Sequence, residues 1–145
     1  MIHARILKRY APGPDSAGFT LDVDLQTSAG VAVLFGPSGS GKTLTLDCIA
    51  GFVRPEEGRI LADQQILFDA ASGVHLSPQA RQCGYVFQNY ALFPHMTVRE
   101  NLAFAGERLP RLERHRKVSE MLERFRLADV AGRRPHQISG GQKQR

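Results

Sequence analysis

The sequence predicts an α/β fold, and three consecutive features carry this prediction. Residues 31–35 form a continuous apolar run, which is typical of a strand buried on both faces of a parallel sheet. The glycine-rich segment 36–43 follows directly, and residues 42–51 then show a helical pattern that stops at Gly51. A buried strand, a glycine-rich loop and a helix in this order are expected to form the centre of the fold.

The glycine-rich segment fits the phosphate-binding pattern G-x-x-x-x-G-K-[ST]. Glycines allow the backbone to approach phosphates closely, and the N–H groups at the start of the helix favour an anion. Lys42 is expected to reach the β- and γ-phosphates, and the Thr43 hydroxyl is expected to bind magnesium. The sequence therefore predicts a P-loop NTPase core that binds a nucleoside triphosphate, ATP with Mg²⁺. The residues of this loop are Gly36, Pro37, Ser38, Gly39, Ser40, Gly41, Lys42 and Thr43.

The remaining pattern divides the chain into a strand-rich and a helical part. Alternating apolar residues predict an N-terminal antiparallel β portion at 2–8 and 19–25, with turns at 11–18 and 28–30. Short strands are expected near 59–62, 64–68 and 84–87, with a loop over 69–83. We expect a core over residues 1–90 and a helical subdomain over about 91–145. Predicted helices lie at 97–105, from Pro110, near 127–131 and from Ser139.

Several apolar side chains of the helical part recur at helical spacing and are expected to face its core: Leu112, Val118, Met121, Leu122 and Phe125.

Charge and hydropathy limit the possible partners. The 145 residues carry a formal net charge of +5, and residues 107–145 hold eleven Lys and Arg against five Asp and Glu. A basic half raises the possibility of nucleic acid, but aromatic side chains do not interleave with the basic ones as base stacking requires. We therefore expect a solvated helical face near a membrane or a partner, and no nucleic acid. No apolar run approaches the roughly 18 residues of a membrane span, so if this protein acts at a membrane, another subunit must provide the spanning part.

Two further elements follow the loop in a characteristic order. Gln88 comes directly after the predicted strand 84–87, and Ile138, Ser139, Gly140, Gly141 and Gln142 follow the helical stretch. In this order the sequence resembles the nucleotide-binding subunit of ATP-binding cassette (ABC) transporters over essentially its whole length. The signature of that family is usually Leu-Ser-Gly-Gly-Gln, so Ile138 is a mild departure.

The resemblance implies roles for these residues. Gln88 would contact magnesium and the attacking water, and act in catalysis together with Lys42. Residues 138–142 would bind the γ-phosphate of ATP held by the other subunit of a homodimer. An aromatic residue stacks on adenine in this family. Tyr10 is the first candidate for this role, and Phe19 is the second. Many relatives have a hydroxyl residue after the P-loop threonine, whereas Leu44 offers only its N–H.

The segments 76–81, 84–88 and 92–98 resemble the ATPases of bacterial importers of oxyanions and small solutes, most closely those for molybdate. Sulfate, iron, polyamine and sugar importers have similar ATPases and remain alternatives. The implied partners are integral membrane permease subunits and, indirectly, a periplasmic or extracellular solute-binding protein. The implied location is peripheral, on the cytoplasmic face of the inner membrane.

The family normally continues beyond the signature with a strand ending in Asp and a catalytic Glu, and then a switch His. None of these follows Gln142, so we expect the C-terminal part of the cassette to be missing and the coding sequence to continue beyond Arg145. The alternative functions are a nucleotide-binding module without turnover and an ABC protein of DNA repair or translation.

Overall fold

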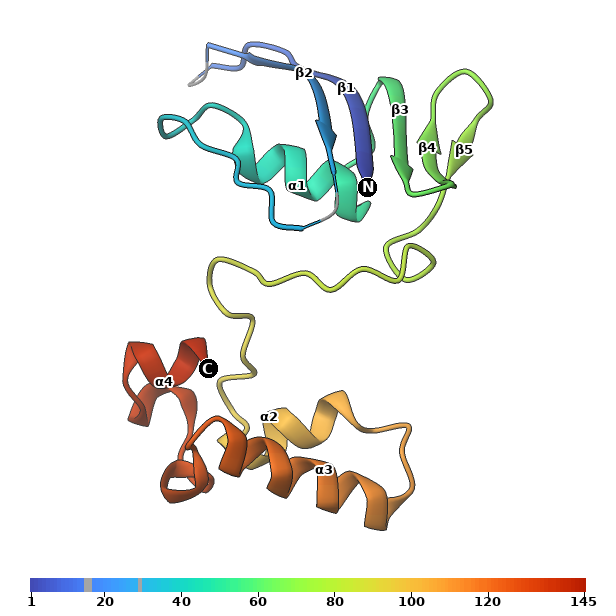
Figure 1. Cartoon of the computed structure of the whole chain (residues 1–145). Coiled ribbons are helices and arrows are strands. Elements are labelled where there is room, and N and C mark those ends of the chain that lie inside the picture. The colour runs from blue at the N-terminus through green and yellow to red at the C-terminus, as the bar shows by residue number, and fades with distance from the viewer. Residues whose placement is uncertain (15–16, 29) are drawn as a thin grey trace. The chain divides into compact units, whose positions relative to one another are not determined.

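The computed structural model describes residues 1–14, 17–28 and 30–145. Residues 15–16 of the predicted 11–18 turn, and Ala29 of the predicted 28–30 turn, lie outside the described residues. The chain forms two compact units, Met1–Tyr85 and Val86–Arg145, called here the N-terminal and C-terminal units (Figure 1).

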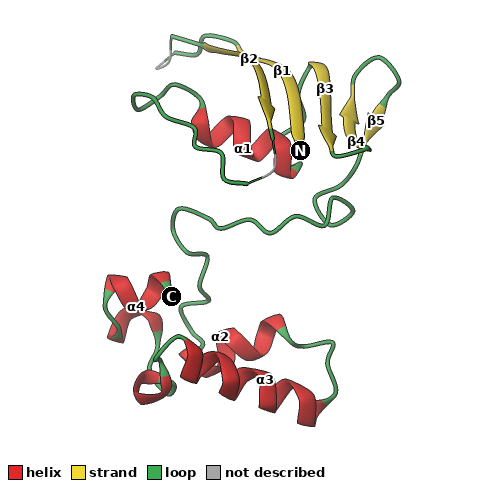
Figure 2. Cartoon of the chain, viewed as in Figure 1, coloured by secondary structure: helices red, strands yellow, loops and turns green. Residues whose placement is uncertain are grey.

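The N-terminal unit contains a five-stranded sheet in the order β2-β1-β3-β4-β5, in which every neighbouring pair is antiparallel (Figure 2). The strands predicted at 2–8 and 19–25 are confirmed and extend two residues further, and those near 59–62 and 64–68 are also confirmed. The predicted loop 69–83 contains one additional short strand. The strands are β1 Ile2–Tyr10, β2 Phe19–Thr27, β3 Glu57–Ala62, β4 Gln65–Asp69 and β5 Val74–His75.

Helix α1, Lys42–Ala50, packs against one face of this sheet. Successive strand residues point to opposite faces, so Ala4 and Ile6 of β1 share the face that meets the helix, and both are fully buried. Cys48 enters this core from the helix. The helix ends as predicted at Gly51, which has φ 90° and donates its N–H to the Asp47 carbonyl at 2.9 Å.

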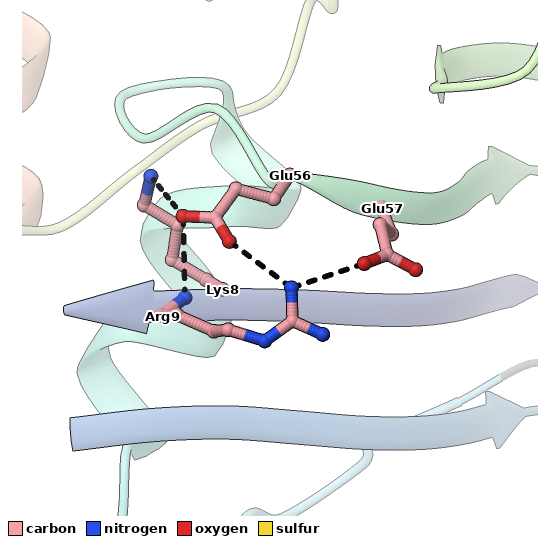
Figure 3. Close-up of polar contacts among 4 residues, drawn as sticks. All are labelled: Lys8, Arg9, Glu56 and Glu57. Atoms are coloured by element: carbon pink, nitrogen blue, oxygen red, sulfur yellow. Dashed lines mark hydrogen bonds and ion pairs between the residues drawn. The ribbon is translucent and has the colours of Figure 1, made fainter. Parts of the chain in front are cut away.

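A charged cluster joins the end of β1 to the start of β3 (Figure 3). Glu56 contacts Lys8 Nζ at 3.3 Å and Arg9 Nη1 at 3.5 Å, and Arg9 also pairs with Glu57 at 3.0 Å. Burial opposes ionisation of Glu56, but hydrogen bonds from Lys8 and the Arg9 backbone N–H outweigh it and lower the pKa of Glu56. These contacts fix the strand just before Tyr10.

Two predicted strands are wrong. Residues 31–35 and 84–87 form no strand, and the side chains of Val31 and Phe35 are 96% and 100% exposed. An apolar run becomes a buried parallel strand only if neighbouring parallel strands supply its hydrogen bonds and cover both faces. Among the described strands all pairings are antiparallel, and none includes these segments. Their apolar composition alone therefore does not order them into the sheet.

The C-terminal unit is helical, and a separate core holds it together. The predicted capping box is confirmed: Thr97 Oγ1 accepts from Glu100 N–H at 3.2 Å, and the Glu100 carboxylate accepts from Thr97 N–H at 2.7 Å. The elements are α2 Val98–Ala105, α3 Arg111–Arg124, η1 Ala128–Val130, η2 Pro135–Gln137 and α4 Gly140–Gln144.

The core of this unit follows the predicted face of α3 only in part. Val118 and Leu122 are buried as expected, together with Leu127 and Val130. Leu112 was expected in the core but is 87% exposed, because it lies in the first turn of α3, beyond the cluster that α2 and η1 cover. Phe125, also expected in the core, caps the C-terminal end of α3 and is exposed.

Candidate nucleotide-binding site

The glycine-rich loop 36–43 leads into α1, and two of its glycines have left-handed backbones. Gly39 has φ 81° and Gly41 has φ 89°, conformations that side chains rarely adopt. A Cβ on Gly41 would lie 2.6 Å from Leu21 Cδ1 and 3.1 Å from Phe19 Cζ, so glycine is also required there by space. Gly41 is the N-cap residue of α1, which directs the first backbone N–H groups of the helix towards the loop.

Lys42 bends back over the loop that precedes it. Its Nζ donates to the carbonyl oxygens of Gly36 at 2.8 Å and Pro37 at 2.6 Å, and lies 3.4 Å from Ser40 Oγ. The loop is also closed by a hydrogen bond from Ser40 N–H to the Pro37 carbonyl at 3.3 Å. A positive charge and the first-turn amides of α1 are thus gathered at one place, which is the arrangement that binds phosphate.

The next residues of α1 differ in their exposure. Thr43 is exposed beside the loop, whereas Leu44 packs against the core of the sheet. The Thr45 hydroxyl is buried and donates to the Gly41 carbonyl at 2.9 Å, so this buried polar group has a partner within the helix. Thr43 is therefore the hydroxyl of this helix start that solvent or a ligand reaches.

The two aromatic candidates are register partners across β1 and β2. Tyr10, at the end of β1, pairs with Phe19, at the start of β2. The Phe19 ring lies beside Gly41 of the loop, whereas the Tyr10 ring has Lys8 Nζ 5.5 Å from its centroid. The structure thus places Phe19 next to the phosphate-binding loop.

Gln88 lies in an exposed turn of the C-terminal unit, in which Tyr90 N–H donates to the Phe87 carbonyl at 2.9 Å. The signature segment begins α4, which confirms the predicted helix start at Ser139, and it also forms a capping box. Ser139 Oγ accepts from Gln142 N–H at 3.2 Å, and Gln142 Oε1 accepts from Ser139 N–H at 2.9 Å. Ile138 packs against the helical core, and Gly140 and Gly141 form the first turn of α4.

Arg81 was not singled out as a functional residue by the sequence, because an arginine in a polar loop is normally solvated. It is only 5% exposed, and its guanidinium donates to main-chain oxygens at the end of α1. Tyr85 contacts the same helix: its hydroxyl donates to Asp47 Oδ1 at 2.5 Å, and this hydrogen bond raises the pKa of Tyr85 to about 12.

A glycine-rich loop with left-handed glycines, an inward-turned lysine and a helix start defines the class of phosphate-loop nucleotide-binding proteins. Residues 20–145 match the family model for ABC transporters. The chain therefore belongs to the ABC transporter family.

Individual relatives agree with this assignment. The chain is 47% identical over 127 residues to the molybdenum import ATP-binding protein ModC of Paramagnetospirillum magneticum, covering 88% of this chain and 35% of the relative. It is 39% identical over 127 residues to the molybdate/tungstate import ATP-binding protein WtpC of Archaeoglobus fulgidus, covering 88% of this chain and 50% of the relative. The chain thus spans between a third and a half of the length of these two relatives.

Solved structures show the same fold. The dimeric structure of MJ0796, a bacterial ABC transporter cassette, has a TM-score of 0.77 at 29% identity, covering 99% of this chain and 66% of the cassette. A post-hydrolysis dimer of the same ATP-binding cassette, bound to ADP and phosphate, has a TM-score of 0.75. Within the described part of this chain, no helix combines the length and apolar composition needed to cross a bilayer.

Proposed function

We propose that this chain binds ATP with Mg²⁺ at residues 36–43 and belongs to the ATPase subunit of an importer. The observation that carries the proposal is the convergence of the Lys42 ammonium, the left-handed glycines and the start of α1 on one loop. This arrangement would stabilise the negative charge of a triphosphate.

The residues around the loop divide the work of binding. Lys42 would hold the β- and γ-phosphates, and Thr43 would offer its hydroxyl to Mg²⁺. Gln88 would complete the magnesium site and orient the attacking water through its side-chain amide, which both donates and accepts hydrogen bonds. Magnesium would neutralise charge that develops on the phosphates during hydrolysis. Tyr10 is proposed to stack on adenine, with Phe19 as the alternative because its ring lies next to Gly41.

We further propose that a second copy of the chain completes the site. Residues 138–142 would contact the γ-phosphate of ATP bound to the partner through the Ser139 hydroxyl and the Gly140 and Gly141 amides. The dimeric state of the similar MJ0796 cassette supports this assignment.

The transported solute is proposed to be molybdate, or a similar oxyanion, because the relatives described above carry that description. Permease subunits at the inner membrane and an external solute-binding protein would be the partners, and the chain would act at the cytoplasmic face.

Deleting the gene and comparing uptake of molybdate with uptake of sulfate tests the identity of the solute. Loss of sulfate uptake with molybdate uptake unchanged would contradict the choice.

Titration with a fluorescent ATP analogue, with and without Mg²⁺, tests nucleotide binding. Replacing Lys42 with Ala should weaken binding by roughly tenfold or more, because hydrogen bonds from a charged donor are lost. Lys117→Ala is the matched control, since Lys117 is an exposed residue of α3 that pairs with Glu113 in the neighbouring turn. Equal binding by the wild type and the Lys42→Ala variant would overturn the proposal.

A further inference from the structure

The guanidinium of Arg81 closes the C-terminal end of α1. Its Nη1 donates to the carbonyl oxygens of Cys48 at 2.8 Å and Ile49 at 2.7 Å, and its Nε donates to Leu76 O at 2.9 Å. The last carbonyls of a helix have no partner within the helix, and a cation there is favourable. Gly51 leaves the necessary space, because a Cβ on that residue would lie 2.6 Å from Arg81 Nε.

Tyr85 supplies a second, independent attachment to the same helix. Its hydroxyl donates to the Asp47 carboxylate at 2.5 Å, and its ring meets Phe52 edge to face with centroids 5.0 Å apart. Arg81 and Tyr85 therefore reach three consecutive residues of the helix, Asp47, Cys48 and Ile49.

The segment held in this way has little other regular structure. Residues 76–85 lie in no helix or strand, although turns at Ser77 order its first half. The helix that holds the segment begins at Lys42 in the phosphate-binding loop. Tyr85 precedes Gln88 by only three residues, which span at most roughly 11 Å of extended chain. The contact between Tyr85 and α1 therefore limits, through chain length alone, how far from that helix Gln88 can lie.

We propose that Arg81 and Tyr85 are positioning residues that fix segment 76–85 to the phosphate-loop helix, so that Gln88 is presented from a point set by that helix. The inference rests on the proposed nucleotide site, since Gln88 has a role only if a phosphate and its metal lie at residues 36–43. Neither Arg81 nor Tyr85 needs to contact the ligand for this role. They act through the main-chain oxygens and the carboxylate of α1.

Hydrogen exchange of the chain with and without Mg²⁺ and the slowly hydrolysed analogue ATPγS tests the inference. In the wild type, the ligand should slow exchange of amides in 36–45 and in 83–88 by about tenfold or more, because binding stabilises the ordered state. In Tyr85→Phe and Arg81→Met, slowing at 36–45 should remain, while slowing at 83–88 should fall to within about twofold of the ligand-free rate.

Two matched controls separate this effect from general loosening. Tyr90→Phe removes the hydroxyl of another tyrosine, and Arg116→Met removes an exposed arginine of α3 that pairs with Glu120. Both should behave as the wild type does. If Arg81→Met fails to fold, Tyr85→Phe decides the matter, because it removes a single hydroxyl group.

Slowing of both segments in both variants would overturn the positioning role, and so would a wild type in which the ligand slows only residues 36–45. Absence of slowing at 36–45 in the wild type would instead overturn the proposed nucleotide site. The two failures are therefore distinguishable in one experiment.

Discussion

Gly51 leaves open the space that the Arg81 guanidinium occupies at the end of α1: a Cβ on Gly51 would lie 2.6 Å from Nε and 2.9 Å from Cζ. Gly51→Ala should therefore destabilise the N-terminal unit through both its φ of 90° and this overlap. Gly73→Ala is the matched control, because Gly73 has φ 71° with nothing within 4 Å of its Cβ position.

Urea unfolding followed by circular dichroism measures the difference between these two variants. Gly73→Ala should cost about 1 kcal/mol from backbone strain alone. Gly51→Ala should cost about 1–3 kcal/mol more, because the buried guanidinium must move. Equal losses in the two variants would show that Arg81 does not depend on the space beside Gly51.

Gly41 offers the corresponding test within the phosphate-binding loop. A Cβ there would meet Leu21 of β2 at 2.6 Å, whereas a Cβ on Gly39 would meet nothing within 4 Å, although both residues have left-handed backbones. Gly41→Ala should lower the free energy of unfolding by about 2 kcal/mol more than Gly39→Ala does. Thermal unfolding of both variants checks this ranking, and a larger loss in Gly39→Ala would contradict the packing of the loop on β2.

Stability of the N-terminal unit should depend on the protonation of His75. Burial disfavours the imidazolium, and the charges of Arg81 and Arg54 repel it, so the pKa of His75 lies below its ordinary value of 6.5. In the unfolded chain His75 takes up its proton near pH 6.5. Between pH 6.5 and the lower pKa of the folded state, the unfolded state therefore binds more protons than the folded state does. The contribution of neutral His75 to the free energy of unfolding is thus present above pH 6.5, and it is lost as the pH falls through the pKa of His75 in the folded state.

Urea unfolding midpoints, measured above pH 6.5 and below the folded-state pKa of His75, show how the stability depends on pH. His75→Gln removes the titration but keeps a hydrogen-bond acceptor near Arg81 Nη2, which lies 3.4 Å from His75 Nδ1. The midpoint of the wild type should fall more on acidification than that of His75→Gln. An equal fall in both proteins would exclude His75 as the source.

The signature segment predicts a dependence of dimerisation on Ser139. Ser139→Arg places a bulky cation where the partner's γ-phosphate would approach, so dimers that form with ATP should be lost while binding of nucleotide to the monomer is retained. Size-exclusion chromatography with ATPγS and Mg²⁺ measures this. Dimers of the variant in the same proportion as in the wild type would show that the serine does not face a partner's ligand.

The sequence predicts local structure well where local patterns determine it. Alternation in β1 and β2 follows from one covered face, and the ends of α1 and α2 follow from Gly51 and Thr97, whose capping chemistry acts within a few residues. The loop pattern predicts special backbone freedom at its glycines 36, 39 and 41, and φ is positive at Gly39 and Gly41 but not at Gly36.

Features that depend on distant partners could not be predicted in the same way. The apolar run 31–35 has the composition of a buried strand, but its state depends on which strands lie beside it. The burial of Arg81 depends on the carbonyl oxygens of Leu76, Cys48 and Ile49. Cys48 and Ile49 lie more than thirty residues earlier in the sequence. Leu112 shows the same limit, since helical spacing alone does not show where the neighbouring core ends.

The backbone amide NMR spectrum of the chain, titrated with ATP and Mg²⁺, tests most directly whether residues 36–43 bind phosphate. The largest shift changes are predicted at the amides of Gly39, Gly41, Lys42 and Thr43, with smaller changes along α1, and the Lys42→Ala variant should lose them. Saturable changes centred elsewhere, with these four amides unaffected, would contradict the assignment of residues 36–43 as the phosphate-binding loop.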